Sequence, residues 1–158
     1  MARKTEELKK PAGAPMSKLE QLVRDSGLEV DKPDVARLRA FVYQKVYDLL
    51  LAATVQARAN NRQLFEPSDL PITRGLQLLI NDFKMLHTAI NLGPLLEKLS
   101  KLPPLDLGSS ASTEALLPDI IGALTLGLAR AFKIIDPEMK KPAEVDWQKV
   151  EQIFDLLL

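Results

Sequence analysis

Residues 33–61, PDVARLRAFVYQKVYDLLLAATVQARANN, carry the longest helical pattern in the chain. Pro33 suits the first turn of a helix, and apolar side chains then recur at three- and four-residue steps up to Asn60. A second apolar side lies near the middle, where Asp48 is the only charge for several turns. The pattern predicts a helix of about 27 residues that neighbouring elements must cover on several faces.

Shorter helices are predicted on both sides of this long one. Upstream, Ser17 and Glu20 have the spacing of a capping box, and the apolar stripe that follows predicts a helix over about 17–26. Downstream, Ser68 or Asp69 can cap a third helix with an apolar stripe, in which Pro71 falls in the first turn. The first half of the chain therefore follows a short, long, shorter order.

The second half follows the same order. A short leucine-rich helix stops at Pro103, a long helix opens near Thr113, and Asp146 is a plausible cap for a last helix. An offset of 77 residues aligns several anchors of the two halves, including Asp69 with Asp146, which favours a divergent internal duplication. The last helix is expected to turn these side chains inward: Trp147, Val150, Ile153, Phe154 and Leu157.

Composition places the chain among ordinary soluble domains of the all-α class. It has 158 residues, and β-branched residues nowhere alternate with polar ones as a strand requires. It contains no Cys, which excludes a disulfide scaffold, a Cys-based zinc site and a thiol enzyme. Lys plus Arg and Asp plus Glu both number 21, so no net charge draws the protein to nucleic acid.

The first 15 residues, MARKTEELKKPAGAP, are expected to form a mobile N-terminal arm. They start basic but lack the apolar stretch of a signal peptide. Elsewhere the longest run without a charged residue, 85–96, is far shorter than the ~20 apolar residues of a membrane span. We therefore expect a cytoplasmic protein with no membrane partner, and association with the nucleoid is the alternative location.

The helix order and one residue pair resemble a known fold. A short, a long and a shorter helix are the plan of the histone fold, and the spacing of Arg62 and Asp69 in ARANNRQLFEPSDL is that of its loop Arg and third-helix Asp. Over residues 16–158 the sequence looks like an uncharacterised bacterial family whose single chains contain two fused histone folds. The first half is also similar to histone-fold transcription subunits of the CCAAT-binding type.

This resemblance implies two tandem histone-fold units, 16–86 and 87–158, packed as an intramolecular pseudo-dimer that forms one cooperative domain. It also implies that Arg62 and Asp69 form a structural clamp. The second half departs from the pattern, because Met139 stands seven residues before Asp146 and no Arg is there to pair with it. Fusion of the halves makes their pairing intramolecular, at high effective concentration.

Small residues in the two long helices are expected where the helices cross. Glycine lowers helix propensity by roughly 1 kcal/mol relative to alanine, so two glycines inside one helix suggest close packing, with sequence drift as the alternative. The predicted crossing residues are Ala52, Ala53, Gly122, Ala123 and Gly127.

Charge near the predicted loops argues for weak DNA binding at most. Histones use Lys and Thr just after the loop Arg for phosphate contacts, and Gln63 and Leu64 stand there in this chain. The basic residues that remain are interleaved with acidic ones, so a solvated surface is the simpler interpretation. The candidate DNA contacts are Lys18, Arg24, Lys32, Arg62, Lys140 and Lys141.

Catalytic patterns are weak. His87 is the only His, and no second His or Cys can complete a metal or nucleophile site with it, so a structural or capping role is expected. We therefore expect no catalytic residues, no metal and no cofactor. The alternative is an enzyme or small-ligand protein with a cleft near Tyr43, Tyr47 and Trp147.

The sequence thus favours a non-enzymatic histone-fold module that binds a protein partner, or a second copy of itself, through its outer helical faces. DNA association is expected to be weak. A histone-like or transcription-factor-like DNA-binding protein is the alternative.

Overall fold

The computed structural model describes residues 18–158 of the chain. The predicted arm at residues 1–15 and the predicted cap Ser17 lie outside these residues. The described part is mostly helical, with a single two-residue strand pair, so the all-α prediction is confirmed at that level.

The first half contains a helix over residues 18–25, the long helix α2 (Lys32–Ala59), strand β1 (Leu64–Phe65), the 3-10 turn η1 (Pro67–Asp69) and helix α3 (Arg74–Lys84). Helix α2 begins with a reciprocal cap, in which Asp31 and Asp34 each accept a hydrogen bond from the other's backbone N–H at 3.1 Å. It ends where Asn61 takes a left-handed conformation (φ 59°), which Asn tolerates better than most residues.

The second half contains α4 (Gly93–Ser100), strand β2 (Gly108–Ser109), the long helix α5 (Ala111–Ile135) and α6 (Glu144–Leu157). Ser110 caps α5 by accepting a hydrogen bond from the Thr113 N–H at 3.2 Å. Asp146 lies in the first turn of α6, where its carboxylate accepts from the Ala143 N–H at 2.8 Å.

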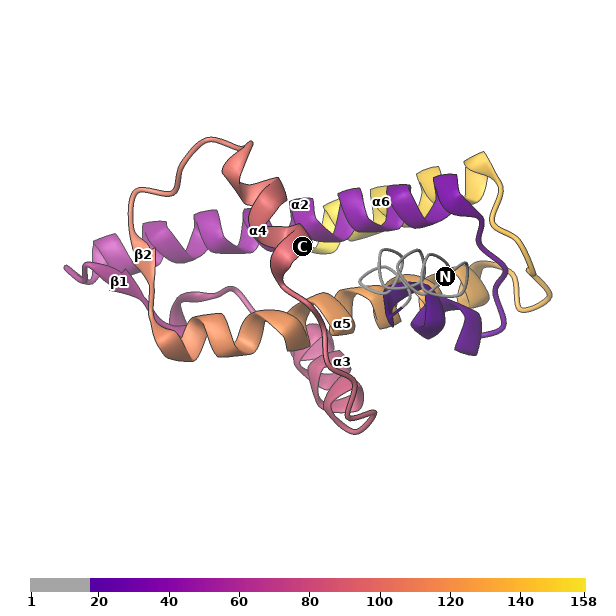
Figure 1. The fold of residues 1–158 in the computed structure, drawn as a ribbon, viewed down its shortest axis with the longest axis horizontal. Coiled ribbons are helices and arrows are strands. Elements are labelled where there is room, and N and C mark those ends of the chain that lie inside the picture. Colours follow the sequence, from indigo (N-terminus) through magenta and orange to yellow (C-terminus); the bar gives the residue numbers. More distant parts are fainter. Residues whose placement is uncertain (1–17) are drawn as a thin grey trace, which may run out of the picture.

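The two long helices, α2 and α5, run along the long axis of the molecule, and the remaining elements pack around them (Figure 1). Strands β1 and β2 pair in parallel at one end, with Leu64 opposite Gly108. At the other end the Glu29 N–H donates to the Lys140 carbonyl at 2.6 Å. Each end therefore joins a loop of the first half to a loop of the second half.

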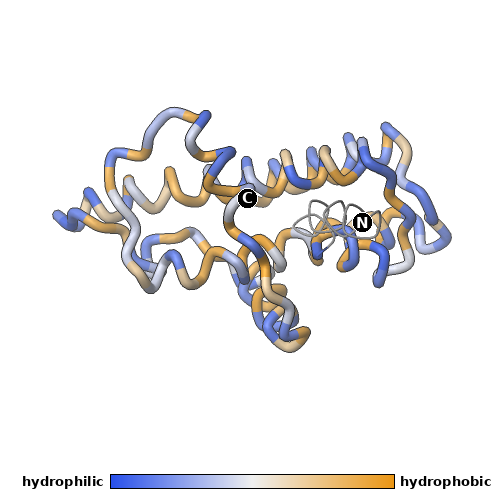
Figure 2. Tube along the Cα trace, in the orientation of Figure 1, coloured by the Kyte–Doolittle hydropathy of each residue, from blue (hydrophilic) through white to orange (hydrophobic). Residues whose placement is uncertain are grey.

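The core is one continuous apolar cluster to which both long helices contribute. Apolar residues recur along the inner sides of the helices, whereas the loops at the ends of the molecule are more polar (Figure 2). Helix α5 supplies an unbroken buried stretch from Ile120 to Ala129. Its residues qualify by length and composition as a membrane span, but 67% of that window is buried inside the fold, as expected for a core helix.

The start of the third helix differs from the sequence prediction. Ser68 and Asp69 do not cap α3, because η1 ends at Asp69 and a separate helix begins after Thr73, whose hydroxyl accepts from the Leu76 N–H at 3.1 Å. Pro71 explains the break, since a proline disfavours helical geometry in the residue before it, and Leu70 is extended. Pro71 therefore lies between two helical segments and not inside the first turn of α3.

Candidate functional site

Arg62 and Asp69 are paired side chain to side chain in the connection between α2 and α3. Asp69 accepts two hydrogen bonds from the Arg62 guanidinium, one of them at 2.6 Å, and a third from the Glu66 N–H at 2.7 Å. The Asp69 side chain is only 1% exposed. The hydrogen bond from Arg62 lowers the pKa of Asp69 below its usual value, although desolvation opposes this shift. The pair holds the loop against η1.

The other candidate DNA contacts gather at the opposite end of the molecule. There the amino group of Lys141 lies 2.8 Å from Asp31 and 2.6 Å from Asp34, and these hydrogen bonds raise its pKa. Arg24 is also engaged, with Glu20 at 2.7 Å and with the Val30 carbonyl. Three candidates make no ion pair within the described part of the chain and are exposed: Lys18, Lys32 and Lys140.

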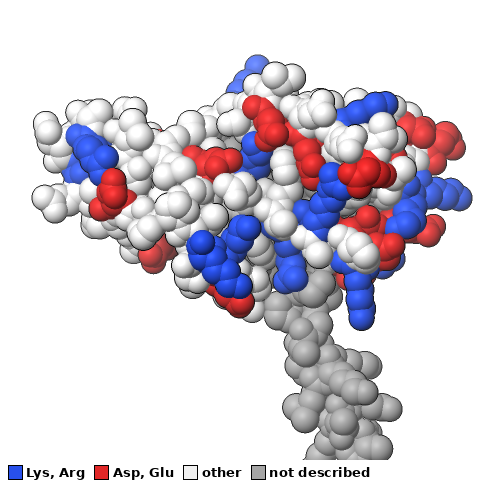
Figure 3. Space-filling model, turned by 90° about the horizontal axis from the view of Figure 1, so that it is seen from above, with Lys and Arg blue, Asp and Glu red and all other residues white. Residues whose placement is uncertain are grey.

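The structure therefore divides the predicted contacts between two ends and pairs half of them with acidic or carbonyl groups. Figure 3 shows one face of the molecule, on which basic and acidic side chains are interspersed over much of the surface. Such a surface has little long-range attraction for a phosphate backbone.

The small residues of α5 have a different neighbour from the one predicted. A Cβ added at Gly122 would lie 2.2 Å from the ring of Phe83, and one at Gly127 would lie 2.7 Å from Leu79 Cδ1. Phe83 and Leu79 belong to α3, so both glycines make room for α3 and not for a crossing with α2. Ala53 and Ala123 are fully buried in the core, and Ala52 is half-buried.

The three aromatic residues of the predicted ligand cleft do not converge. The Tyr47 hydroxyl donates to the Pro103 carbonyl at 2.8 Å, and the Trp147 indole N–H donates to Asp34 at 3.2 Å. Both polar groups therefore have structural partners. Tyr43 lines a cavity.

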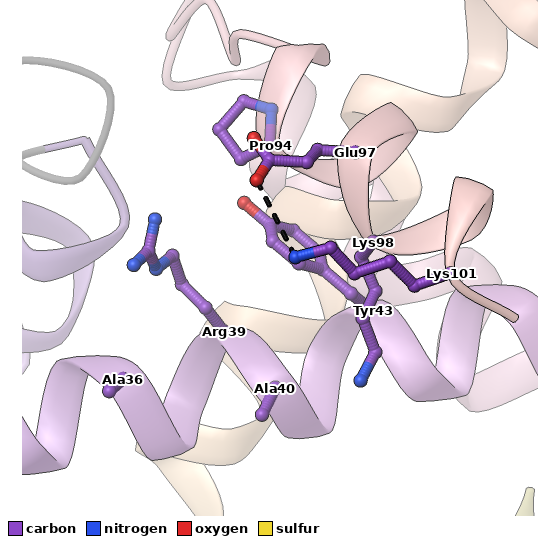
Figure 4. A pocket seen from close by; sticks show the side chains of 8 residues that line it. All are labelled: Ala36, Arg39, Ala40, Tyr43, Pro94, Glu97, Lys98 and Lys101. Atoms are coloured by element: carbon purple, nitrogen blue, oxygen red, sulfur yellow. Dashed lines mark ion pairs between the residues drawn. The ribbon is translucent and has the colours of Figure 1, made fainter.

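That cavity, of about 250 Å³, lies between α2 and α4, and its basic lining was not predicted from the sequence. Arg39 and Tyr43 rise from α2 on one side, and side chains from α4 and the residue after it close the other (Figure 4). Sequence periodicity can place each residue on its helix but cannot bring the two helices together. The lining consists of Ala36, Arg39, Ala40, Tyr43, Pro94, Glu97, Lys98 and Lys101.

A second, apolar groove of about 270 Å³ lies between α3, α5 and α6. The sequence predicted Ile153 and Leu157 to face inward, but they are 40% and 69% exposed at the rim of this groove, and Phe154 is half-buried. Trp147 and Val150 are buried as predicted. The inward stripe of α6 therefore stops short of its last turn, because no described element covers that turn.

His87 lies in the turn after α3 in a left-handed conformation (φ 51°), and its N–H donates to the Lys84 carbonyl at 3.2 Å. The residue is exposed. Among residues 18–158, no group of three or more His, Asp or Glu side chains is placed to hold a metal ion.

Comparison with known proteins gives a family and a fold. Residues 19–155 match the model of a family described as a domain of unknown function, DUF1931. A crystal structure of a protein from Thermus thermophilus is 40% identical, with a TM-score of 0.86, and the match covers 90% of this chain and 97% of that one. A crystal structure of a protein from Aquifex aeolicus is 24% identical, with a TM-score of 0.76 over 91% and 95% of the two chains, and it shows similarity of fold alone.

A search of curated proteins found no match. Neither the family nor the two crystal structures is described as a histone fold or as a CCAAT-binding subunit. The histone-fold resemblance therefore stays a prediction.

Proposed function

Because this chain belongs to the DUF1931 family, a domain of unknown function, its role has to be argued from its own residues, and we propose that it is a non-enzymatic histone-fold binding module. In this proposal two histone-fold units form an intramolecular pseudo-dimer. Its main partner is a protein that docks on an apolar groove, and its association with DNA is weak.

Two observations support the pseudo-dimer. The loops of one half meet the loops of the other at both ends of the molecule, through β1 and β2 and through Glu29 and Lys140. Moreover, Asp69 accepts from the backbone N–H three residues before it, and Asp146 does the same 77 residues later. Equivalent local contacts at the offset of the sequence repeat are what a duplicated unit should retain.

The observation that carries the binding role is the apolar groove between α3, α5 and α6. Leucine side chains of α3 and α5 form its wall, and Ile153 and Leu157 of α6 stand exposed at its rim. Contiguous exposed apolar surface is unfavourable in water and commonly marks a docking site. A groove walled by three helices suits an amphipathic helix, which can place an apolar side chain into it every third or fourth residue.

DNA is the less favoured partner because the basic residues that a histone-like protein would use are largely engaged. Arg62, Arg24 and Lys141 each have an intramolecular partner that a phosphate would have to displace. An enzymatic role is disfavoured by the sequence, which offers one His and no Cys for a nucleophile or metal site. A DNA-binding role remains the second candidate, since Lys18, Lys32 and Lys140 are exposed.

Site-specific photo-crosslinking tests the groove. A photoreactive residue at Leu157, on the rim, is compared with one at Ile134, which is 81% exposed but does not line the groove. We expect a discrete adduct from position 157 in cells and none from position 134. Sedimentation velocity over a concentration series shows whether the partner is a second copy, in which case Leu157→Glu should dissociate it and Ile134→Glu should not. Equal crosslinking at both positions, or none at 157, would contradict the proposal.

A further inference from the structure

The cavity between α2 and α4 has an unbalanced charge. Three cationic side chains line it, from Arg39, Lys98 and Lys101, and they face a single carboxylate, that of Glu97. This carboxylate lies 3.7 Å from the Lys101 amino group, and the pair is drawn as the dashed line in Figure 4. Within residues 18–158, neither Arg39 nor Lys98 makes an ion pair. Cationic side chains therefore outnumber carboxylates by three to one around this cavity, and Lys98 also borders a neighbouring hollow lined by Asp48, Glu151 and Asp155.

Two neighbouring cationic residues of α2 have acidic partners, unlike Arg39. Arg37, two residues before Arg39, is held by Glu144 at 2.6 Å and by Glu151 at 2.9 Å. Lys45 is paired with Asp155 of α6. These side chains face α6, which is acidic along that side, whereas Arg39 faces α4. On α2, Arg39 therefore faces α4 without the acidic partners that α6 supplies to Arg37 and Lys45.

Arg39 carries a second sign of a missing partner. Its Nε atom is buried and has no hydrogen-bond acceptor, and it is the one such side-chain atom found in the part of the chain that the structure describes. Buried donors almost always have a partner, because leaving one unpaired is unfavourable. Arg39 lines the cavity from the α2 side (Figure 4), so an anionic ligand there would give its guanidinium a partner.

The donors around the cavity match a phosphate group. Arginine presents several N–H groups in a planar fork that suits tetrahedral oxyanions, and lysine adds a mobile positive charge. Burial raises the pKa of Tyr43 above its usual value, with Arg39 opposing the shift, so its phenol stays protonated at neutral pH and can donate as well. Ala36 and Ala40 add no bulk, and about 250 Å³ is room for one or two phosphate groups.

We propose that the cavity between α2 and α4 binds a phosphate group of a phosphorylated ligand, with Arg39 and Lys98 as its main cationic contacts. The proposal stands apart from the apolar groove on α3, α5 and α6, and it does not rest on the function proposed above. The same chemistry is offered by a small phosphorylated compound and by the backbone of a nucleic acid, and the experiment separates these two sources.

The probe is pyrophosphate, which is titrated into the full chain by isothermal titration calorimetry at low ionic strength. A second measurement follows the thermal midpoint of unfolding, which rises when a ligand binds only the folded state. We expect saturable binding at one site. Arg39→Gln and Lys98→Gln should each weaken binding about tenfold or more, the usual effect of losing a charged hydrogen bond. Lys149→Gln removes the same charge from an exposed position outside the cavity and should leave binding unchanged.

Duplex DNA of arbitrary sequence distinguishes the sources. If pyrophosphate displaces DNA and both cavity variants weaken DNA binding, the phosphate is that of a nucleic-acid backbone. If pyrophosphate binds and DNA does not compete, the ligand is a small phosphorylated compound. Should Arg39→Gln fail to fold by circular dichroism, the half-exposed Lys98 still provides the test. The proposal is overturned if millimolar pyrophosphate gives no saturable binding, or if Lys149→Gln weakens binding as much as Lys98→Gln.

Discussion

Gly122 on α5 is the position at which one added methyl group should be least tolerated. An alanine Cβ there would lie 2.2, 2.3 and 2.4 Å from three ring carbons of Phe83, far inside van der Waals contact. Phe83 is only 1% exposed and packs in the core, so its ring has no free space into which to move. Gly122→Ala therefore forces α3 and α5 apart.

The expected loss of stability follows from two opposing effects. Overpacking a well-filled core usually costs about 1–3 kcal/mol, and a contact this short belongs at the upper end. Replacing glycine by alanine inside a helix recovers roughly 1 kcal/mol of helix propensity. The net change is a loss of about 2 kcal/mol in the free energy of unfolding, which for a chain of this size lowers the thermal midpoint by roughly 4–8 °C.

Thermal and urea unfolding followed by circular dichroism measure this change, and Gly75→Ala is the matched control. A Cβ at Gly75 of α3 meets nothing within 4 Å, so this variant should be unchanged or gain up to about 1 kcal/mol. The smaller side chain in Phe83→Leu should recover part of the Gly122→Ala loss, giving a favourable coupling in the double-mutant cycle. A Gly122→Ala variant at least as stable as the wild type would refute the packing of α3 on α5 described above.

Three further predictions concern the Arg62–Asp69 pair, the core that the two halves share, and the surface charge. Asp69→Ala should lower the free energy of unfolding by at least the ~1 kcal/mol of a lost hydrogen bond, since it leaves the Glu66 N–H and Arg62 without their acceptor, whereas Gln63→Ala should change little. Because the folded-state pKa of Asp69 lies below its unfolded value, this carboxylate stabilises the fold above about pH 4, and the difference from Asp69→Ala in thermal melts should shrink as pH falls below that value. Fragments 16–86 and 87–158 should each aggregate or remain largely unfolded, since each alone exposes the apolar side of a long helix. When mixed, they should become helical by circular dichroism. Two well-folded monomeric fragments would contradict the pseudo-dimer. In gel-shift titrations, DNA binding should be independent of sequence, with a slope of log K against log salt of about −2 to −4. Deleting residues 1–15 should reduce the magnitude of that slope by about one unit. Tight binding at physiological salt that survives the deletion would contradict a weak, charge-driven association.

Features fixed by neighbouring residues could be predicted from the sequence. The ends of α2 depend on Asp31 to Asp34 at the start and on Asn60 and Asn61 at the end, and both lie close to the predicted limits. The Arg62–Asp69 contact is implied by the resemblance of this stretch to the histone fold, and the two side chains are hydrogen bonded in the structure. Such interactions need only a short stretch of backbone to be placed correctly.

Features that depend on which helices meet could not be predicted in the same way. Gly122 and Gly127 indicated a crowded face of α5, but the sequence does not say whether α2 or α3 crowds it. Similarly, the apolar pattern of α6 continues through Leu157, although the groove leaves that residue exposed. An apolar period identifies the side of a helix that prefers burial, and only the tertiary arrangement decides how far along the helix burial extends.

Charge is the property for which the sequence and the structure give the most different information. From the sequence alone the cations and carboxylates simply cancel, 21 against 21. In the fold many of them form ion pairs, some over long separations, as for Lys141 with Asp31 and Asp34, which are 110 and 107 residues away. The composition cannot show which charged side chains lack an ion-pair partner in the fold. Arg39 is one such side chain, with a buried Nε that has no acceptor beside a cavity that another unpaired cation also lines. Because an uncompensated cation is costly to hold in a partly buried site, its persistence there argues for an anionic ligand more strongly than any count of basic residues does.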